Sequence, residues 1–590
     1  MDIFGTTVTA IHEVWRITNF ICGVVREIRA YEDNVSQLQI ELEHEFVFLE
    51  TFKKLFFDDD THELRQFRYL PDNLTRSVHN ILTALNKCLA EYRLVALKHG
   101  LDLSEAEPAV ELELETNTVL PHGTESDGYR DKFRGLVTAL RQKAKAPEWA
   151  LFSKSKIQAL LDQYSQWTER LRQVMTLMLL VEGRVGSLSV HEIATQGAGS
   201  ALGLQKTAAR QLRAHSEPPA DFGPLEGSFR KMGNASSTSS ELHYAVGTYT
   251  DAFGVSSTTV IMEKHTFDIF DRTTTTFSER IDIRSALVRK LAWTLKEDNE
   301  PSPALDVAPE SNSSNKQTQQ RRQSHVNLLP CLGYLPVAHD GYPSLIYSLP
   351  PRTTGSSILT LHDYILNFPR PALGDRFAMA LSVAETVLDI HTSGWVHKGI
   401  WSRGILVIPT TERVSLYLVG WSAARPRSVE LSAQSLEAGK ARSVKMSAQS
   451  LQAQRLGRSV PPQLEPQLYH HRERYQNVTA GFTAKHDIYS VGVVLLEMAL
   501  WTTMSKQFAG PINKAKEKGA LPPASMVTDA LAKLARGERM AQEMGRGYAR
   551  VVQRCLDTDF EVDKHDEQES ALLGQFQALV ADQLSKGAVI

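Results

Sequence analysis

The sequence has few cysteines, almost no net charge and no long apolar run. Its four cysteines lie far apart, with no C-x-x-C spacing and no histidines near them, at Cys22, Cys88, Cys331 and Cys555. Neither a disulfide framework nor a metal site is therefore expected. The 65 basic and 68 acidic residues nearly cancel, whereas a nucleic-acid-binding protein usually carries an excess of positive charge. We therefore expect no nucleic-acid partner.

Segments typical of membrane-spanning or secreted chains are also lacking. The longest apolar run, residues 174–181, is far shorter than the roughly 20 residues that cross a bilayer as a helix. Residues 1–30 have no basic leader, and Glu13 and Arg16 interrupt their apolar pattern, so they do not read as a secretory signal. We expect a cytoplasmic protein.

Length and periodicity predict more than one domain. A chain of 590 residues is too long for a single hydrophobic core, so two or three domains are expected. Up to about residue 190, apolar residues recur at three- and four-residue spacing, which predicts an all-α helical bundle over residues 1–195. Residues 196–235 are rich in Gly, Ala, Ser and Pro, which is typical of a flexible linker.

Beyond this segment the pattern changes from strands to helices. Four strand candidates, in which β-branched and aromatic residues are frequent, lie at 241–250, 257–270, 326–337 and 343–350. Helical patterns dominate after residue 359, so residues 236–580 are expected to form an α+β domain with two unequal lobes. Two polar stretches, 297–325 and 427–462, are expected to be insertions, and the second contains a duplicated RSV…SAQSL sequence.

The stretch HTSGWVHKGIWSRGILV, residues 391–407, carries an altered motif. It resembles the catalytic loop of protein kinases, H-R-D-L-x-x-x-N, in which the Asp accepts the substrate proton and the Asn holds magnesium. His397 matches the His, whereas Gly399 stands at the Asp position and Gly404 at the Asn position. The resemblance implies a kinase-like fold without its general base and without one of its metal ligands.

A second kinase landmark, D-F-G, is altered in the same way. The stretch VSLYLVGWSAARP, residues 414–426, places Gly420 at the magnesium-binding Asp and Trp421 at the Phe. Moving the register by one residue puts Val419 at the Asp, which does not restore a carboxylate either. Phosphoryl transfer depends on positioning and on metal ions that neutralise the developing charge. We therefore expect a pseudokinase and not an enzyme.

The nucleotide-binding motifs of kinases are only partly matched. The stretch TVIMEKHTF, residues 259–267, resembles the V-A-I-K strand and places Lys264 at the lysine that contacts the phosphates. In the helical stretch that follows, only Glu279 lies near the position of the usual glutamate partner. Gly247 and Gly254 do not form G-x-G-x-x-G, and Gly247 is interpreted as a turn residue. We expect no cofactor, and ATP binding through Lys264 stays open.

Residues that support the kinase fold are better kept than those that perform its chemistry. The stretch KHDIYSVGVVLLEMALW, residues 485–501, resembles the central helix of the large lobe, in which Asp487 would accept backbone hydrogen bonds from the catalytic loop. We assign Asp487, His397 and Trp421 to a retained structural core. The stretch LYHHRERYQ, residues 468–476, stands where A-P-E is expected and lacks it.

The N-terminal residues resemble the fungal HeLo (prion-inhibition and propagation) domains, through their helical layout and the opening MDIFGTTVTAIHEVWRITNFICGVVREI. That resemblance implies self-association and, in some members, membrane-perturbing cell death. The residue pattern itself allows two interpretations of the first helix. Either its apolar face binds a membrane surface, or Val14, Trp15, Ile21 and Val25 pack in the bundle core, and the periodicity favours the core.

Together, these features predict a non-catalytic signalling or interaction protein with a HeLo-like effector or oligomerisation domain, acting in fungal non-self recognition or regulated cell death. Protein partners and self-association are expected. Two alternatives stay open. One is an atypical kinase that uses substitute residues, and the other is a membrane-perturbing bundle controlled by the C-terminal domain.

Overall fold

The computed structural model describes most of the helices and strands of the chain. The described residues are 3–29, 36–57, 72–98, 151–185, 202–232, 244–254, 257–265, 277–296, 328–336, 342–350, 353, 358–409, 414–426, 464–474, 482–518, 523–560, 562 and 569–588. Both predicted insertions, 297–325 and 427–462, lie outside them. So do residues 99–150 of the expected helical bundle.

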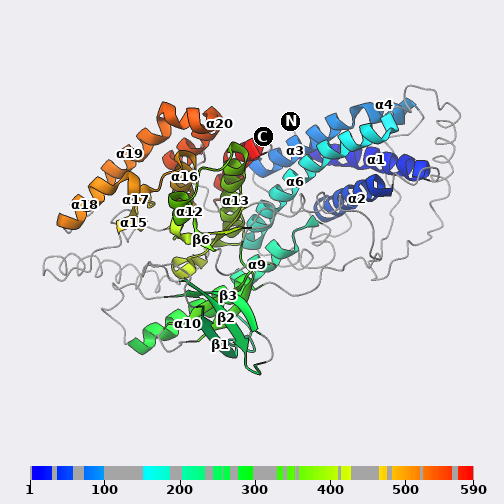
Figure 1. The fold of residues 1–590 in the computed structure, drawn as a ribbon. Helices are drawn as coiled ribbons and strands as arrows, with labels where there is room; N and C mark the ends of the chain where they lie inside the picture. Colours follow the sequence, from blue (N-terminus) through cyan, green and yellow to red (C-terminus); the bar gives the residue numbers. More distant parts are fainter. Residues whose placement is uncertain are drawn as a thin grey trace. The chain divides into compact units, whose positions relative to one another are not determined.

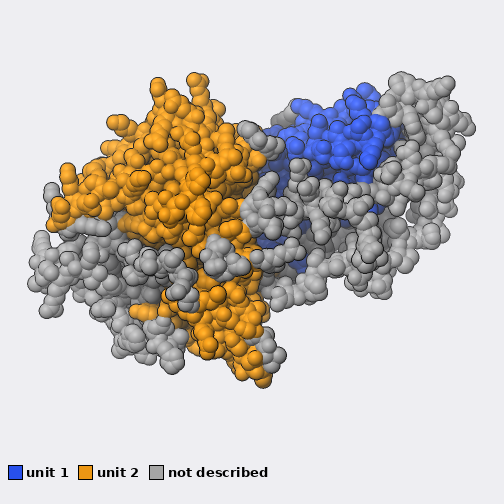
Figure 2. Space-filling view, viewed as in Figure 1, with its two compact units in different colours: residues 1–208 blue, residues 209–590 orange. Residues whose placement is uncertain are grey.

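The chain forms two compact units, residues 1–208 and residues 209–590 (Figure 2). It is rich in helices, and its small antiparallel sheet lies in the second unit, which confirms the expectation of a helical N-terminal part followed by a part with both strands and helices. Among the described residues, no helix combines the length and the apolar character needed to cross a membrane.

The first unit is a bundle of helices built around α1 (Figure 1). Its helices are α1 (Ile3–Arg29), α2 (Ser36–Phe56), α3 (Asp72–Cys88), α4 (Ala90–Lys98) and α6 (Lys154–Val185). α1 contacts α2, α3 and α4, while α6 contacts α2 and α3. Each helix therefore contributes an apolar face to one shared core.

The apolar residues of α1 lie in this core. Val14 and Ile21 are completely buried and Val25 is almost so, which confirms the core interpretation of the first helix. Trp15 is half-buried, and the ammonium group of Lys53 lies 5.3 Å from its ring centroid. Because these side chains already fill the bundle, α1 would have to leave it before its apolar face could meet a membrane.

The predicted flexible linker, residues 196–235, contains regular structure and needs correction. Helix α9 (Gln205–His215) and strand β1 (Gly227–Lys231) both lie in it. Two of the small residues in this range, Ala208 and Ala214, are buried in the helix. The boundary between the two units falls within α9.

A five-stranded antiparallel sheet opens the second unit, in the order β1-β2-β3-β5-β4. Its other strands are β2 (Tyr244–Asp251), β3 (Ser257–Lys264), β4 (Cys331–Leu335) and β5 (Ser344–Ser348). Helix α10 (Phe277–Leu295) packs against β4 and β5. On the sheet face that carries Val260 and Met262, an apolar cluster also includes Ile346 and Leu335.

Gly247 is not a turn residue, contrary to the expectation from the sequence. It lies within β2 and pairs with Lys231 of β1. A Cβ atom at this position would lie 2.4 Å from the ring of Phe229, so the glycine lets the aromatic side chain rest on the strand. The turn between β2 and β3 instead contains Gly254, whose φ of 69° favours glycine.

The rest of the second unit is mainly helical. Its longer helices are α12 (Leu361–Asn367), α13 (Leu373–Thr392), α16 (Ala484–Leu500), α18 (Ala509–Lys518), α19 (Ala524–Arg536), α20 (Glu538–Asp557), α21 (Ser570–Phe576) and α22 (Asp582–Ala588). α16 packs against α13 and α20 and is buried on nearly every side (Figure 1). Four of its apolar side chains are completely buried: Ile488, Val491, Leu495 and Met498.

Short strands hold the loops that follow α13. β7 (Trp395–Val396) pairs with β10 (Arg425–Pro426), and β8 (Ile405–Pro409) pairs with β6 (Leu359–Thr360) and β9 (Val414–Leu418). The loop 397–404 is therefore fixed at both ends by strand pairing. The segment after β9 begins beside it, because the backbone N–H of Val419 donates to the carbonyl of Gly404 at 2.9 Å.

Gly492 allows α16 and α20 to pack closely, and its replacement by alanine tests this contact. A Cβ atom at Gly492 would lie 2.7 Å from Cβ of Cys555, so Gly492→Ala should destabilise the second unit by about 1–3 kcal/mol through overpacking. Gly547 of α20 is the matched control, because a Cβ atom there meets no neighbour within 4 Å. Gly547 lies two residues after the break in α20 at Gly545, whose φ is 78°, so Gly547→Ala should not destabilise the unit. Calorimetric unfolding of both variants checks the pair, and equal midpoints would contradict the packing.

Candidate functional site

A buried carboxylate, Asp487, organises the loop that follows β7. It lies in the first turn of α16 and is completely buried. Its Oδ2 atom accepts a hydrogen bond from the backbone N–H of His397 at 2.8 Å, and its Oδ1 atom accepts one from Lys398 at 2.9 Å. These are the backbone hydrogen bonds that the sequence predicted for Asp487.

A third partner completes the surroundings of this carboxylate. The Nε2 atom of His391 lies 3.0 Å from Oδ2 of Asp487 and is also fully buried. Burial alone would raise the pKa of Asp487, but the bond to His391 and the backbone N–H of His397 together hold that pKa below its ordinary value. Asp487 is therefore a structural anion at neutral pH, with its oxygens occupied by the loop.

The loop backbone adopts a costly conformation that these bonds maintain. Lys398 has a φ of 67°, in the left-handed region that residues with a side chain rarely occupy. Such a conformation typically costs about 1–2 kcal/mol per residue. The N–H of Lys398 donates directly to Asp487, so the residue that carries the strain is the one that the carboxylate holds.

The structure places the predicted glycines around this loop. A Cβ atom at Gly399 would lie 3.1 Å from the carbonyl oxygen of Gly420, so the two glycines that align with the kinase carboxylates lie side by side. A Cβ atom at Gly404 would lie 2.9 Å from the indole of Trp401. Gly420 itself has a φ of 93°. A longer side chain at Gly404 would therefore require Trp401 to move, and one at Gly420 would require backbone strain.

His397 and Trp421 meet beside these glycines. Their ring centroids lie 4.9 Å apart in an edge-on arrangement, and both side chains are buried. Burial lowers the pKa of His397 to about 4, because it outweighs the attraction of Asp487 and Glu263 for the charged form. The imidazole is therefore neutral at pH 7 and braces the loop without carrying charge.

Glu263, a residue that the sequence analysis missed, closes the site from the sheet. It lies on β3, and its side chain is only 2% exposed. Its Oε2 atom accepts the backbone N–H of Gly420 at 3.1 Å, and its Oε1 atom accepts that of Trp421 at 2.6 Å. One carboxylate therefore fixes the backbone at the position where D-F-G would stand.

The surroundings of Glu263 favour its charged form. Burial opposes the charge, but His265, with Nε2 at 3.4 Å from Oε1, and the two backbone N–H groups together lower the pKa of Glu263 below its ordinary value. The hydroxyl group of Tyr347 donates to Oε2 at 3.3 Å. The pKa of that hydroxyl is raised, first by burial and then by the nearby carboxylate. The surroundings therefore favour a buried carboxylate anion beside Gly420.

Lys264, which the resemblance to kinases makes a possible phosphate-contacting lysine, is the residue after Glu263 on β3. Successive side chains of a strand point to opposite faces. Since Glu263 faces Gly420, Lys264 projects to the other face, the side on which Val260 and Met262 form the apolar cluster. A register one residue earlier would place Glu263, and not a lysine, at the last position of V-A-I-K, and strand alternation was the signal that could have indicated which residue faces Gly420.

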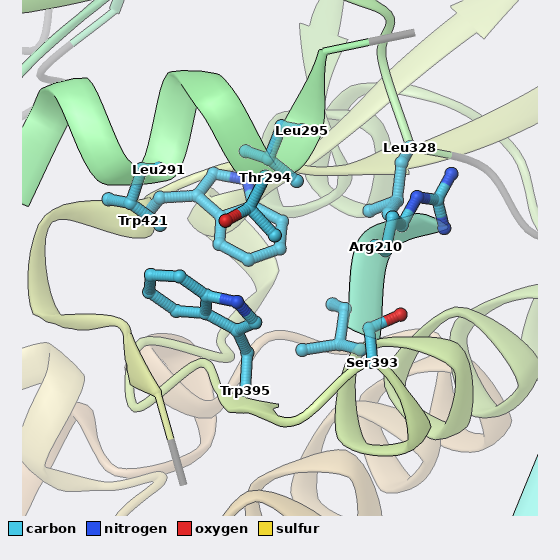
Figure 3. Close-up of a pocket in the computed structure, with 9 residues that line it drawn as sticks. Arg210, Leu291, Thr294, Leu295, Leu328, Ser393, Trp395 and Trp421 are labelled. Carbon is cyan, nitrogen blue, oxygen red and sulfur yellow. The ribbon is translucent and has the colours of Figure 1, made fainter. Parts of the chain in front are cut away.

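A small cavity lies next to Trp421, between α10 and the end of α13. Figure 3 shows the indoles of Trp395 and Trp421 turned into it, below Leu291 and Thr294 of α10. Its volume of about 10 Å³ admits at most one water molecule, so it is a packing defect and not a ligand pocket. Nearby, the guanidinium of Arg284 on α10 donates to the carbonyl of Ser422 at 2.7 Å, which ties the helix to the same segment.

A second buried carboxylate, Glu497, joins the loop to the segment after residue 464. Tyr469 donates its hydroxyl to Oε1 of Glu497 at 2.7 Å and lies 2.9 Å from the hydroxyl of Ser402. The backbone N–H of Met504 also donates to Oε1 of Glu497. Burial raises the pKa of Glu497 to about 7 despite these bonds. No local sequence pattern indicated this network, because its members are far apart along the chain.

Comparison with protein-family models and with curated proteins returns no match for the chain. The chemistry of the site therefore rests on its own geometry. Its charged groups, Asp487 and Glu263, each hold two backbone N–H groups, so their oxygens are committed to the fold. The arrangement can position a loop, but the described side chains around Gly399, Gly404 and Gly420 offer no free base at those positions.

Replacing Glu263 by glutamine tests whether this carboxylate holds the backbone at Gly420 and Trp421. Glutamine has one acceptor oxygen, so an amide N–H₂ group would face the backbone N–H of Gly420 or Trp421, and unfolding should become easier by about 1–3 kcal/mol at pH 7. Glu226→Gln, at an exposed position of the same unit, is the control and should match the wild type. Urea unfolding measures all three proteins.

The pH dependence of that difference follows from the lowered pKa of Glu263. A depressed carboxyl pKa stabilises the fold fully above the ordinary value of 4.5, and this contribution is lost as the pH falls through the folded-state value. The gap between Glu263→Gln and the wild type should therefore shrink below about pH 4.5. A glutamine variant as stable as the wild type at pH 7 would contradict the role of this carboxylate.

Proposed function

We propose that residues 209–590 form a catalytically inactive, protein-kinase-like domain that acts as an interaction or switch module. The observation that carries the proposal is the contrast around one loop. Asp487 holds the loop backbone at His397 and Lys398, as the resemblance to kinases expects, while the positions of the base and the metal ligands are glycines. A retained structural framework that lacks the catalytic residues is typical of a pseudokinase.

The architecture of the second unit agrees with this proposal. A five-stranded antiparallel sheet with one packed helix, α10, precedes a larger helical part built around α16. That division matches the two unequal lobes of the kinase fold expected from the sequence. The retained contact between His397 and Trp421 also supports a kinase-type core that no longer serves catalysis.

The residues present do not fit magnesium and ATP. A nucleotide phosphate needs positive charge or N–H groups, whereas Glu263 places a buried carboxylate beside Gly420 and occupies the backbone N–H groups there. The loss of a general base alone typically lowers a rate by about 10²- to 10⁴-fold. Since the metal-ligand positions Gly404 and Gly420 also lack oxygen-bearing side chains, we derive no phosphoryl-transfer step.

For the first unit we propose a HeLo-like role in self-association. It has its own core, formed by α1, α2, α3, α4 and α6, which is consistent with an autonomous module. α2 also presents Ile40 and Val47, two turns apart, with exposed fractions of 63% and 47%. Apolar side chains aligned on one helix face suit contact with another protein surface.

The test of the pseudokinase proposal uses the full chain, ATP and magnesium. Thermal unfolding of the second unit should not shift when Mg·ATP is added, because a ligand that binds only the folded state must raise its midpoint. Incubation with γ-labelled ATP and a generic protein substrate should transfer no phosphate, with an active kinase as the positive control. A magnesium-dependent midpoint shift together with phosphate transfer would contradict the proposal and favour an atypical kinase.

A further inference from the structure

Three arginines form a stripe along the exposed side of α20. They are Arg546, Arg550 and Arg554, and their four-residue spacing places them on one face of the helix. Arg546 and Arg550 are exposed and Arg554 is half-buried, whereas the opposite side of the helix packs into the core of the second unit. All three follow the break at Gly545, so this arginine stripe belongs to one regular helical segment.

The arginine stripe has no acidic partner within the described part of the chain, where none of its three side chains forms a hydrogen bond or an ion pair. The acidic side chains near it are engaged elsewhere, because Glu543 pairs with Arg370 and Arg539. Asp557, at the end of the helix, pairs with Arg536 of α19. Like charges four residues apart destabilise a helix slightly, so an anionic partner would relieve a small cost.

The chain itself contains an acidic segment that matches the stripe. The stretch VELELET, residues 110–116, places Glu111, Glu113 and Glu115 at alternate positions and lies outside the described residues. In an extended chain, alternate side chains point to the same side at a spacing of about 6.6–6.8 Å. Helix positions four residues apart lie about 6 Å apart along the axis. Three carboxylates can therefore meet the three guanidinium groups in register.

We propose that the arginine stripe of one molecule docks the acidic segment, residues 110–116, of a second copy of this chain. Guanidinium groups bind carboxylates through paired hydrogen bonds that a lysine cannot reproduce, and the stripe consists of arginine alone. Because each chain carries both the stripe and the segment, two copies can engage reciprocally. The second contact then forms within the complex, which strengthens an association whose individual ion pairs are weak.

Two other anionic partners fit the stripe less well. A membrane surface is bound by clusters of about four to eight basic residues, usually together with apolar side chains that enter the lipid. None of the exposed large apolar side chains of the described residues lies on α20. A nucleic acid needs a broad basic surface, whereas the stripe spans about 12 Å of helix axis and the chain has a net charge of -3. The narrow stripe therefore favours a short peptide.

The proposed contact is independent of the pseudokinase role. It adds a second surface to the self-association proposed for the first unit, which was assigned to the exposed apolar side chains of α2. The two surfaces differ in their response to salt. Exposed ion pairs weaken as the ionic strength rises, whereas contacts between apolar side chains do not. Salt and selective variants can therefore separate them.

Fluorescence anisotropy with a labelled peptide of residues 108–118 tests the docking. The protein is the full chain with the three glutamates of its own segment replaced by glutamine, so that this segment does not compete. Arg546→Gln together with Arg550→Gln should weaken peptide binding by about five- to tenfold, because two exposed ion pairs are lost. Lys514→Gln together with Lys533→Gln removes the same charge from exposed positions of α18 and α19 and should leave binding unchanged. A peptide of the same composition with its glutamates adjacent should bind more weakly.

Sedimentation velocity of the full chain tests whether a second copy supplies the segment. At low ionic strength the wild type should associate as its concentration rises, and added salt should reverse this. Arg546→Glu together with Arg550→Glu should abolish the association. Adding Glu111→Arg and Glu113→Arg to the same chain should restore it, because opposite charges again face one another. Circular dichroism verifies that each variant folds.

The inference is overturned if the peptide does not bind, or if it binds the arginine variant as tightly as the unchanged stripe. It is also overturned if the full chain stays monomeric at every concentration, or if vesicles containing phosphatidylserine bind through Arg546 and Arg550 while the peptide does not. Association that Ile40→Glu abolishes, but that the arginine and glutamate replacements leave unchanged, contradicts the role of the stripe and leaves the role proposed for α2 standing.

Discussion

The carboxylate of Asp487 is the interaction on which the second unit depends. It is buried at the start of α16, the most enclosed helix of the unit, and it binds the backbone of a loop that arrives from the other side of the core. A buried charge is tolerated only where hydrogen bonds replace water. The Asp487 carboxylate accepts two backbone N–H groups and contacts His391. These bonds hold Lys398 of the loop in a left-handed conformation. Because these hydrogen bonds are made to backbone N–H groups, they do not depend on which side chains the loop carries.

Glu263 performs the corresponding task from the sheet. By binding the N–H groups of Gly420 and Trp421, it connects β3 to the segment after β9, while Arg284 connects α10 to the same segment. Two carboxylates on opposite sides therefore fix two neighbouring loops, and His397 and Trp421 fill the space between them. Our proposed function follows from this difference between groups that hold the loops and groups that would perform chemistry. The groups that hold the loops are present, and glycines stand at the positions that the proposed resemblance to kinases assigns to the base and to the metal ligands.

The sequence predicted the parts of this site that depend on local pattern. The helix around Asp487 and the loop with His397 both followed from their resemblance to known motifs of protein kinases. The sequence analysis did not establish which face of strand β3 each residue occupies. It therefore missed Glu263 and considered only the neighbouring Lys264. It also failed for α9, whose small residues resemble a linker in composition although two of them are buried in the helix. Networks such as Ser402, Tyr469 and Glu497 join distant segments, so no local pattern indicates them.

Hydrogen exchange of the full chain, followed by mass spectrometry, tests the central claim most directly, because it reports whether the two loops are held by the protein's own carboxylates. Peptides that cover residues 395–399 and 418–422 should exchange slowly without any ligand, since the N–H groups of His397, Lys398, Gly420 and Trp421 are bonded to Asp487 or Glu263. Mg·ATP should leave their exchange unchanged. Rapid exchange of these peptides that slows when Mg·ATP is added would contradict the account, because it would mean that the loops await a nucleotide.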